Sequence, residues 1–285
     1  MIARSLGSAW LRIGAIVFTL LAFAGVALCE DRPEPDSREA LELRETKRLI
    51  EAELPRWQFE IGEDRKALVL QPKPVLRWTN PATSRVYGDI YVWTLDGRPE
   101  VVMSLYKGWR PAWGFTGEFH SLALANLVGR RERAVAWKCD QPGVELRDVP
   151  DAPAVAESPV RRLRQMRDLA AGFSVVLIDR RRNREGERQS LRLLTNPIYR
   201  YASPARGVAD GALFAFVVGT DPEALLVVEA RGKEDETRWQ YALARLNRDE
   251  LTAYHHEQEV WRVDATSYQD RDKPYMLMSL PEAAK

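Results

Sequence analysis

Two long apolar hairpins constrain the fold of this chain more than any other feature. Residues 210–231 read DGALFAFVVGTDPEALLVVEAR and residues 88–108 read GDIYVWTLDGRPEVVMSLYKG, so each segment pairs two apolar runs around a turn rich in Gly, Asp and Pro. Side chains of a strand alternate between its two faces, yet here both faces are apolar, as in the step from Ile90 to Tyr91. Such strands must be covered on both sides, by a helix, by another sheet or by a ligand.

A helix and a strand are predicted before each hairpin. Ser37 suits the N-cap of the first helix, which Pro55 ends. Ser158 and Pro159 start the second helix, and Gly172 is expected as its left-handed C-cap. Apolar residues at steps of three and four predict one core-facing stripe on each helix, with the lysine of the first stripe snorkelling. The stripes are Ala40, Leu43, Lys47, Ile50 and Leu54, then Val160, Leu163, Met166 and Ala170; the strands that follow are WQFEI (57–61) and FSVVLI (173–178).

The repeated order of these features predicts that the chain is built twice from one plan. The tripeptide TNP occurs at 79–81 and again 116 residues later, whereas Gly88 and Gly211, near the start of each hairpin, are 123 residues apart. We interpret the change of seven as one insertion between TNP and the hairpin. The other matches are Trp57 with Phe173, Pro99 with Pro222, Glu100 with Glu223, Phe119 with Trp239, and Trp137 with Trp261.

Short turns between the predicted strands favour antiparallel pairing, because parallel neighbours need long crossovers. The predicted class is therefore α+β, with antiparallel meander sheets in two pseudo-symmetric copies, each opened by one helix. The expected division is a signal peptide at 1–29, a linker at 30–35, the first copy at 36–146, a linker at 147–157, the second copy at 158–266 and a C-terminal tail at 267–285.

The first 29 residues predict export. Arg4 and Arg12 precede the uncharged apolar run 13–28, which is short for a membrane span and typical of a signal peptide. Cleavage is expected after Cys29 or after Ala27, and an uncleaved anchor is the alternative. The residues Val-Ala-Leu-Cys also resemble a lipoprotein box, except that Leu stands where Gly, Ala or Ser is expected.

The fate of Cys29 decides that of the second cysteine. If Cys29 leaves with the signal peptide, Cys139 is a lone thiol in an exported protein. If Cys29 stays, it can pair with Cys139 or carry lipid. Neither case provides a disulfide framework.

The charge balance argues against nucleic acid as a partner. Without residues 1–29 the chain has 40 basic and 41 acidic side chains, a net charge of −1, and nucleic-acid binding depends on neutralising phosphates. The run DRRRNREGERQ (179–189) is basic but contains Glu185 and Glu187. We interpret it as a solvated hairpin tip, with contact to an acidic surface or lipid headgroups as the alternative. Membrane contact is otherwise expected only through the N-terminal segment.

An aromatic loop is one candidate site. Trp109 and Trp113 lie in YKGWRPAWGFTGEFHSL (106–122), whereas the matching loop of the second copy is polar. Loops on a rigid scaffold often carry function, and flat indole rings stack on sugars or cover apolar ligands. The alternative is that the loop folds back and its tryptophans plug the edge of the core.

Glu118 and His120 are a second candidate. On a strand these two side chains project to one face, and a carboxylate beside a histidine can tune it for acid–base catalysis. The alternative is a structural histidine held by a hydrogen bond.

The segment HHEQE (255–259) does not predict a metal site. On a strand, His255 and His256 point to opposite faces, which leaves too few N or S ligands on one side. The chain also has no G-x-S-x-G, H-E-x-x-H, phosphate-binding glycine loop, C-x-x-C or N-x-S/T motif. We expect neither a metal nor a cofactor.

The segments GDIYVWTLDGRPEVVMSLYKGW, GEFHSL and DGALFAFVVGTDPEALLVVEAR resemble uncharacterised exported proteins of planctomycete bacteria. The resemblance covers most of the chain after residue 29 and implies no activity. We therefore expect a periplasmic or secreted envelope protein, with membrane anchoring as an alternative. Its expected role is to bind a ligand or an envelope partner without catalysis. The alternative function is a hydrolase or transferase that uses Glu118 and His120 as an acid–base pair.

Overall fold

The computed structural model describes most of the chain after the N-terminal segment. The described residues are 37–80, 85–110, 114–180, 185–232, 236–267 and 270–282. The predicted signal peptide and Cys29 lie outside these ranges. Within them, no helix is both long enough and apolar enough to cross a membrane.

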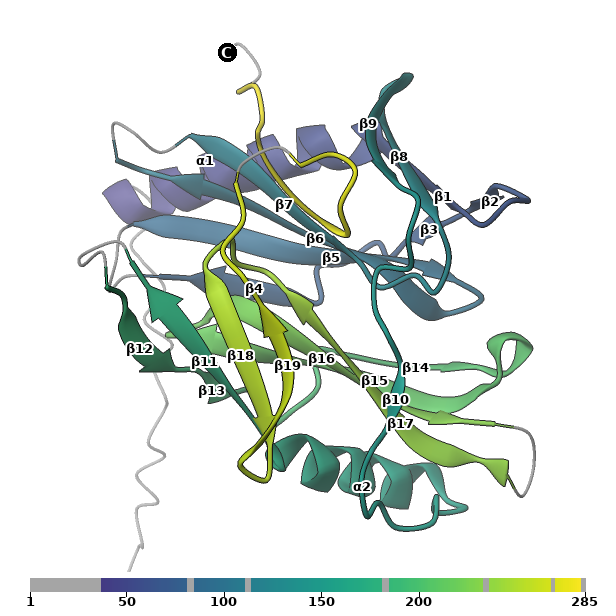
Figure 1. Ribbon diagram of the computed structural model, residues 1–285. Helices are drawn as coiled ribbons and strands as arrows, with labels where there is room; N and C mark the ends of the chain where they lie inside the picture. Colours follow the sequence, from purple (N-terminus) through teal and green to yellow (C-terminus); the bar gives the residue numbers. More distant parts are fainter. Residues whose placement is uncertain are drawn as a thin grey trace, which may run out of the picture.

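The described elements follow the chain in two successive series (Figure 1). The first series is α1 (Arg38–Glu53), β1 (Trp57–Ile61), β2 (Lys66–Ala67), β3 (Val69–Leu70), β4 (Leu76–Thr79), β5 (Val86–Leu95), β6 (Arg98–Gly108), β7 (Phe115–Ser121), β8 (Leu127–Arg131) and β9 (Ala134–Cys139). The second series is β10 (Arg147–Asp148), α2 (Pro159–Ala171), β11 (Phe173–Asp179), β12 (Glu187–Ser190), β13 (Arg192–Leu193), β14 (Tyr199–Ser203), β15 (Val208–Val218), β16 (Asp221–Arg231), β17 (Arg238–Arg245), β18 (Glu250–His255), β19 (Gln258–Val263) and β20 (Tyr275–Ser279).

These strands form four antiparallel sheets. The first central sheet has the order β20-β7-β6-β5-β3, with β4 also paired to β5, and the second has the order β10-β17-β16-β15-β13, with β14 also paired to β15. The first outer sheet is β2-β1-β8-β9, and the second is β12-β11-β18-β19. The two helices and the antiparallel sheets confirm the predicted α+β class.

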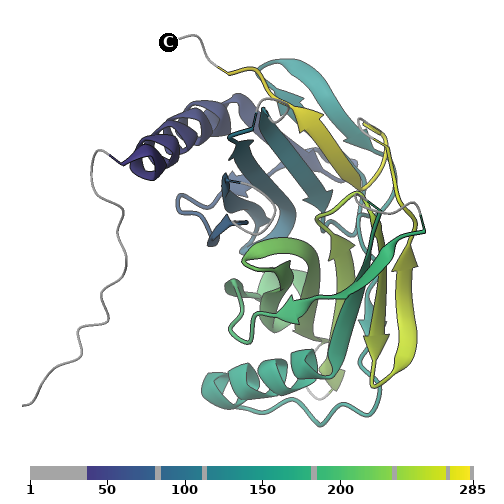
Figure 2. The same cartoon turned by 90° about the vertical axis from the view of Figure 1, so that its left-hand side faces the viewer.

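The two central sheets pack face to face in the middle of the molecule, with α1 on one outer side and α2 on the other (Figure 2). We call α1, the first outer sheet and the first central sheet the first half, and α2 with the other two sheets the second half. The expected linker and tail are not free of structure: β10 of segment 147–157 joins the second central sheet, and β20 of segment 267–285 joins the first. The first half is therefore completed by a strand that follows the second half in the chain.

The layers explain why the central hairpins are apolar on both faces. Ile90 and Val92 face the other central sheet and lie in the core between the two sheets. Tyr91 and Trp93 face the opposite way, into the core beneath α1 and the first outer sheet. The requirement for two-sided cover is therefore confirmed, and a helix layer and a second sheet provide it.

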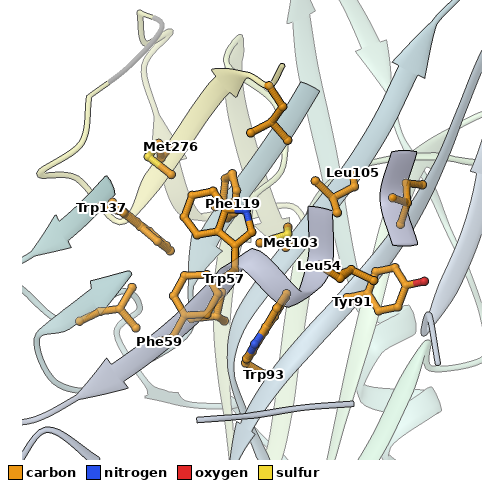
Figure 3. Close-up of a cluster of buried hydrophobic side chains, with 14 of the residues drawn as sticks. Leu54, Trp57, Phe59, Tyr91, Trp93, Met103, Leu105, Phe119, Trp137 and Met276 are labelled. Atoms are coloured by element: carbon orange, nitrogen blue, oxygen red, sulfur yellow. The ribbon is translucent and has the colours of Figure 1, made fainter. Parts of the chain in front are cut away.

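The core of the first half is built largely from aromatic rings (Figure 3). Trp57 and Phe59 of β1 lie stacked, with 5.7 Å between ring centroids. Phe119 of β7 lies 4.6 Å from Trp57 and 6.0 Å from Trp137 of β9. Edge and offset contacts of this kind add stability beyond the buried area, so strands from two sheets are fixed against each other.

Helix α1 has the predicted bounds, and the predicted stripe is correct at Ile50 and Leu54, which are buried, but wrong at Leu43. Its N-cap is Ser37, whose side chain accepts from the backbone N–H of Ala40 at 3.2 Å, and Pro55 follows its end. Leu43 is 37 % exposed instead of facing the core. The helix buries three polar side chains nearby, and each has a hydrogen-bonding or charged partner, as buried polar groups need. These pairs are Glu42 with Arg85 (3.1 Å), Thr46 with the indole of Trp109 (3.2 Å), and Glu53 with Arg131 (2.7 Å).

Helix α2 starts as predicted but ends differently. Ser158 caps it and Pro159 is its first residue, while Met166 and Ala170 are buried. Val160 is 79 % exposed, so the predicted stripe is only partly correct. Gly172 is in the right-handed helical region, not the left-handed one. A Cβ atom at this position would lie 3.0 Å from the His256 ring and 3.2 Å from the His255 ring, so close packing accounts for the glycine.

The predicted place of the seven-residue insertion is wrong. Thr79 ends β4, whereas residues 195–197 precede β14, so the two TNP tripeptides differ in their position relative to the strands. Leu70 of β3 pairs with Trp93, and Leu193 of β13 pairs with Phe216 in the same way. The matching residues of these two pairs are 123 positions apart, so the offset has changed before TNP is reached. The offset between the two series therefore changes from 116 to 123 after β11 begins and before β13, in the hairpin of β11 and β12, whose strands pair from Val176–Ser190 to Asp179–Glu187. This hairpin contains the basic run 179–189, which confirms the predicted hairpin.

One further match from the sequence is wrong. Phe119 was matched with Trp239, but Trp239 pairs with Ala230 and Phe115 pairs with Lys107. Lys107 and Ala230 are 123 residues apart. Phe115 therefore corresponds to Trp239 by strand position.

Buried charges fix one end of the contact between the central sheets. Arg98 donates to Glu229 at 2.8 Å and to Glu100 at 2.9 Å, and all three side chains are fully buried. The Tyr201 hydroxyl donates to the same oxygen of Glu229 at 2.6 Å, and Arg206 lies 3.2 Å from Glu100. At the other end, Thr79 and Asn80 bond to Thr220 and Asp221 at the turn between β15 and β16.

Candidate functional site

A cavity of about 620 Å³ lies where the two halves meet. We call it the seam cavity. Strand β17 forms its floor with Tyr241, Leu243 and Arg245, and β19 contributes Trp261. The edge of the first central sheet adds His120 from β7 and Tyr275 from β20. The remaining walls include residues 142–145, Arg147, residues 264–266, Asp270, Lys273 and Pro274. The volume is in the range of small-molecule sites.

The floor and the rim of the seam cavity differ in exposure. The buried lining residues are mostly apolar or aromatic, and Arg245 is the one among them that carries a charge when His120 is neutral. The rim is exposed and has charges of both signs. The buried lining residues are His120, Val144, Tyr241, Leu243, Arg245 and Tyr275, and the exposed charged ones are Glu145, Arg147, Asp264 and Lys273.

Arg245 is held rigidly by main-chain carbonyls. Its Nε donates to Asn247 O at 2.6 Å, Nη1 to Asp264 O at 2.7 Å and Nη2 to Asp249 O at 2.6 Å. The guanidinium carbon also lies 5.0 Å from the centroid of the Tyr275 ring. Burial lowers the pKa of Arg245 from its usual value, but a guanidinium stays protonated in proteins. A positive charge is therefore fixed at the cavity floor.

His120 is a neutral hydrogen-bond acceptor at the same floor. Its Nδ1 lies 2.8 Å from the carbonyl oxygen of Ser121, and because a carbonyl only accepts, Nδ1 carries the proton. Burial lowers the pKa of His120 to about 4, so the ring is neutral at pH 7 and Nε2 has a free lone pair. The ring centroid lies 6.4 Å from that of Tyr275.

Glu118 lies behind Tyr275 and outside the lining of the seam cavity. Its carboxyl oxygen is 2.5 Å from the Tyr275 hydroxyl. Burial raises the pKa of Glu118 to about 8 and raises the pKa of Tyr275 above its usual value. Both groups are therefore protonated at pH 7.

The structure brings together only part of the candidate site predicted from the sequence. Glu118 and His120 project from β7 on one side of the strand, as their spacing predicts, and both are buried. The hydrogen bonds described for them lead to Tyr275 and Ser121, not to each other. His120 reaches the seam cavity and Glu118 does not.

Trp109 lies at a different surface from His120. Its indole N–H donates to Thr46 of α1 at 3.2 Å, and the Lys107 ammonium lies 5.1 Å from its ring centroid. The half-buried ring lines a shallow depression along α1 with residues such as Leu41. Trp113 lies outside the described residues. Trp109 and the Glu118/His120 pair therefore do not form one site.

The HHEQE segment forms a tight turn instead of a continuous strand. His256 and Glu257 have φ angles of 45° and 70° and connect β18 to β19. His255 is buried against Phe173, with 4.6 Å between ring centroids. Across the described ranges, no group of three or more His, Cys, Asp or Glu side chains is arranged to hold a metal ion. Cys139 is a buried free thiol.

The sequence reasoning missed the residues of the second half that line the seam cavity. Tyr241, Leu243 and Arg245 alternate with buried alanines in RWQYALAR. An arginine in phase with apolar residues on a strand is the signal that could have identified Arg245, because such a charge needs partners in the interior.

No model of a known protein family matches the chain, and neither a curated protein nor a solved structure does. The interpretation of the site therefore depends on its geometry.

Proposed function

We propose that this chain is a non-enzymatic binding protein of the bacterial cell envelope and that its ligand occupies the seam cavity. The single observation that carries the proposal is the cavity itself, with about 620 Å³ of space and walls from both halves. Sites at the junction of structural units, with an apolar lining and few polar groups, are typical of ligand binding. The apolar segment 13–28 supports export to the envelope.

We also infer that the two halves are copies of one unit. The matching strand orders of the two central and two outer sheets support this inference, as does the offset of 123 between the central hairpins. The contacts between the halves are reciprocal: β6 contacts β14, and β16 contacts β4. Reciprocal contact of the same two surfaces is the property of an interface around a twofold axis.

The arrangement favours binding over acid–base catalysis. A hydrolase or transferase of the kind suggested by Glu118 and His120 needs both groups within reach of the reacting atoms. Glu118 is turned to Tyr275 behind the cavity wall, while the proton of His120 is committed to Ser121. Of these two residues only His120 lines the seam cavity, which suits recognition of a ligand better than paired acid–base catalysis.

Native mass spectrometry of the purified full chain tests the proposal. We expect a retained small molecule that is lost when Ala265→Trp adds bulk at the exposed rim of the seam cavity. Ala134→Trp, on an exposed residue of β9, is the matched control and should keep the molecule. Equal retention by both variants, or no retained molecule in the unchanged protein, contradicts the proposal.

A further inference from the structure

We infer that the ligand of the seam cavity is a small organic carboxylate with an apolar or aromatic body, and that Arg245 binds its carboxylate. This inference rests on the proposed function and adds the chemical class of the ligand. It depends on three features of the cavity floor: a buried cation whose described hydrogen bonds include no carboxylate, free hydrogen-bonding groups beside it, and apolar walls around them.

The charge of Arg245 has no carboxylate partner among the hydrogen bonds described for it. Its three hydrogen bonds end on neutral carbonyl oxygens. Fully buried Arg98, by contrast, contacts two glutamates at 2.8 and 2.9 Å. A buried cation without an opposite charge is costly, so an anion in the cavity would stabilise Arg245.

The acidic residues around the cavity do not meet this need. Glu145 pairs with Arg147 at 2.7 Å. Asp270 accepts from the Thr266 hydroxyl at 3.1 Å. The carboxylates of Asp249 and Asp264 attract Arg245 electrostatically, but the hydrogen bonds described between these residues and Arg245 end on main-chain carbonyls. The nearby carboxyl of Glu118 bonds to Tyr275. None of these carboxylates is hydrogen-bonded to Arg245, so a ligand anion can bind to it at the cavity floor.

The hydrogen-bonding groups that remain fit a ligand with an acceptor and a donor. A guanidinium has five N–H groups, and the three bonds described for Arg245 leave two for a ligand carboxylate. The Nε2 lone pair of His120 can accept from a hydroxyl of the same ligand. Arg245 and His120 both flank the Tyr275 ring, at 5.0 and 6.4 Å.

The surroundings favour one negative charge on a body of low polarity. A phosphate dianion is usually bound by several cationic or N–H groups, whereas the buried lining supplies one cation. Tyr241, Leu243 and the half-buried Trp261 form the wall beside it. Aromatic and aliphatic walls of this kind bind flat or apolar groups.

Fluorine NMR titration of the full chain with 4-fluorobenzoate tests this class, and uncharged 4-fluorobenzamide of nearly the same shape is the matched probe. We expect benzoate to bind at least about tenfold more tightly than the benzamide, the ratio typical of one charge-assisted hydrogen-bonding group. Equal binding of the two probes overturns the carboxylate inference and leaves the proposed function standing. Absence of binding by both at millimolar concentration contradicts the inference, and the mass-spectrometric experiment then decides the proposed function separately.

A pair of arginine variants locates the contact. Arg245→Met should weaken benzoate binding by about 10- to 100-fold. Arg238→Met is the matched control, because Arg238 is an exposed arginine of β17 that pairs with Asp148 and does not line the seam cavity; it should change the affinity less than about twofold. Thermal unfolding checks that each variant is folded. If Arg245→Met is unfolded, Arg245→Lys keeps the charge and should show an intermediate loss. If both methionine variants fold and lose affinity equally, the role of Arg245 is overturned. It is also overturned if Arg245→Met does not fold and Arg245→Lys binds benzoate with unchanged affinity.

Discussion

The two halves of the molecule cover the same edge of their central sheets in different ways. In the first half the edge strand is β20, five residues long, and Met276 of this strand is buried against the aromatic core. In the second half the edge strand is β10, which has two residues, Arg147 and Asp148, both exposed. The long apolar strand closes a filled core, whereas the short polar strand lies beside the seam cavity.

Two tryptophans at matching strand positions show the consequence. Trp137 pairs with Gly129 and is 0 % exposed. Trp261 pairs with Ala253 in the same place of the second outer sheet and is half-buried, facing the seam cavity. The proposed binding site therefore lies where the covering strand is short, at a different place from Trp109 of the aromatic loop.

The largest difference between the halves is expected from removing these two indoles. Trp137→Ala should lower the free energy of unfolding by about 3–5 kcal/mol, because it empties a fully packed site and leaves the carbonyl of Lys273 without its indole donor. Trp261→Ala should cost about 1–2 kcal/mol, because only part of the ring is buried. Urea unfolding measures both values. Equal losses would show that the seam cavity is as tightly packed as the core of the first half.

A second contrast concerns the residues that pair with Gly88 in the first half and with Gly211 in the second half. Glu229 faces Gly211 and binds Arg98, whereas the matching position of the first half, opposite Gly88, is Tyr106. Glu229→Gln should cost about 2–3 kcal/mol, because it weakens a buried charge-assisted contact. Tyr106→Phe, the matched control, should cost less than about 1 kcal/mol in the same urea unfolding. A cost for Glu229→Gln no larger than that of the control would remove the network as a stabilising difference.

The third contrast is in titratable groups. Strand β7 has Glu118 and His120 at the positions where β17 has Ala242 and Ala244, so only the first half has groups there whose protonation depends on pH. Glu118 has its pKa raised from 4.5 to about 8, so stability falls as pH rises between these values. His120 has its pKa lowered from 6.5 to about 4, so stability falls as pH drops between these values. The two effects cancel between about pH 4.5 and 6.5, and stability then decreases toward pH 8 by up to about 1.4 kcal/mol per unit.

Glu118→Gln isolates this titration. The variant should lose the decrease in stability between pH 6.5 and 8. It should also show a fall in stability from about pH 6.5 down to 4 that comes from His120, because Glu118 no longer cancels it. His120→Asn should show the reverse, a steady decrease from about pH 4.5 to 8. Urea unfolding at four pH values measures both profiles. Parallel profiles for the original chain and Glu118→Gln would contradict the assignment.

The smallest effects concern a feature that the halves share. Ser37 accepts from Ala40 N at 3.2 Å, and Ser158 accepts from Arg161 N at 3.3 Å. Replacing either serine by alanine should cost about 1 kcal/mol, with similar shifts in the midpoint of thermal unfolding. Replacement of either serine by Asp, which also caps helices, is the control and should restore stability. A loss at only one helix would show that the two caps are not equivalent.

Local patterns predicted most of the fold because they depend on near neighbours in the chain. The two helix starts, the central hairpins and the need for cover on both of their faces follow from caps, turns and strand alternation. The burial of polar residues on α1 could not be predicted in this way. Glu42 and Glu53 are buried because Arg85 and Arg131, far along the chain, provide their partners.

The candidate site was harder to predict for the same reason. The seam cavity joins His120, Arg245 and Tyr275, which lie on three strands of two sheets. The spacing of Glu118 and His120 indicated correctly that they share a side of β7. That Glu118 turns to Tyr275 depends on the pairing of β20 with β7, and no local pattern reports that pairing.

The position of β20 near the end of the described chain also determines when the first half can complete its folding during translation. The first half is translated first, but its central sheet gains its edge strand only when residues 275–279 have left the ribosome. Until then β7 presents unpaired N–H and C=O groups, which can pair with another chain. The N-terminal half of a nascent chain therefore cannot finish folding before the C-terminal half is made, so a stalled or shortened chain exposes an edge that invites aggregation.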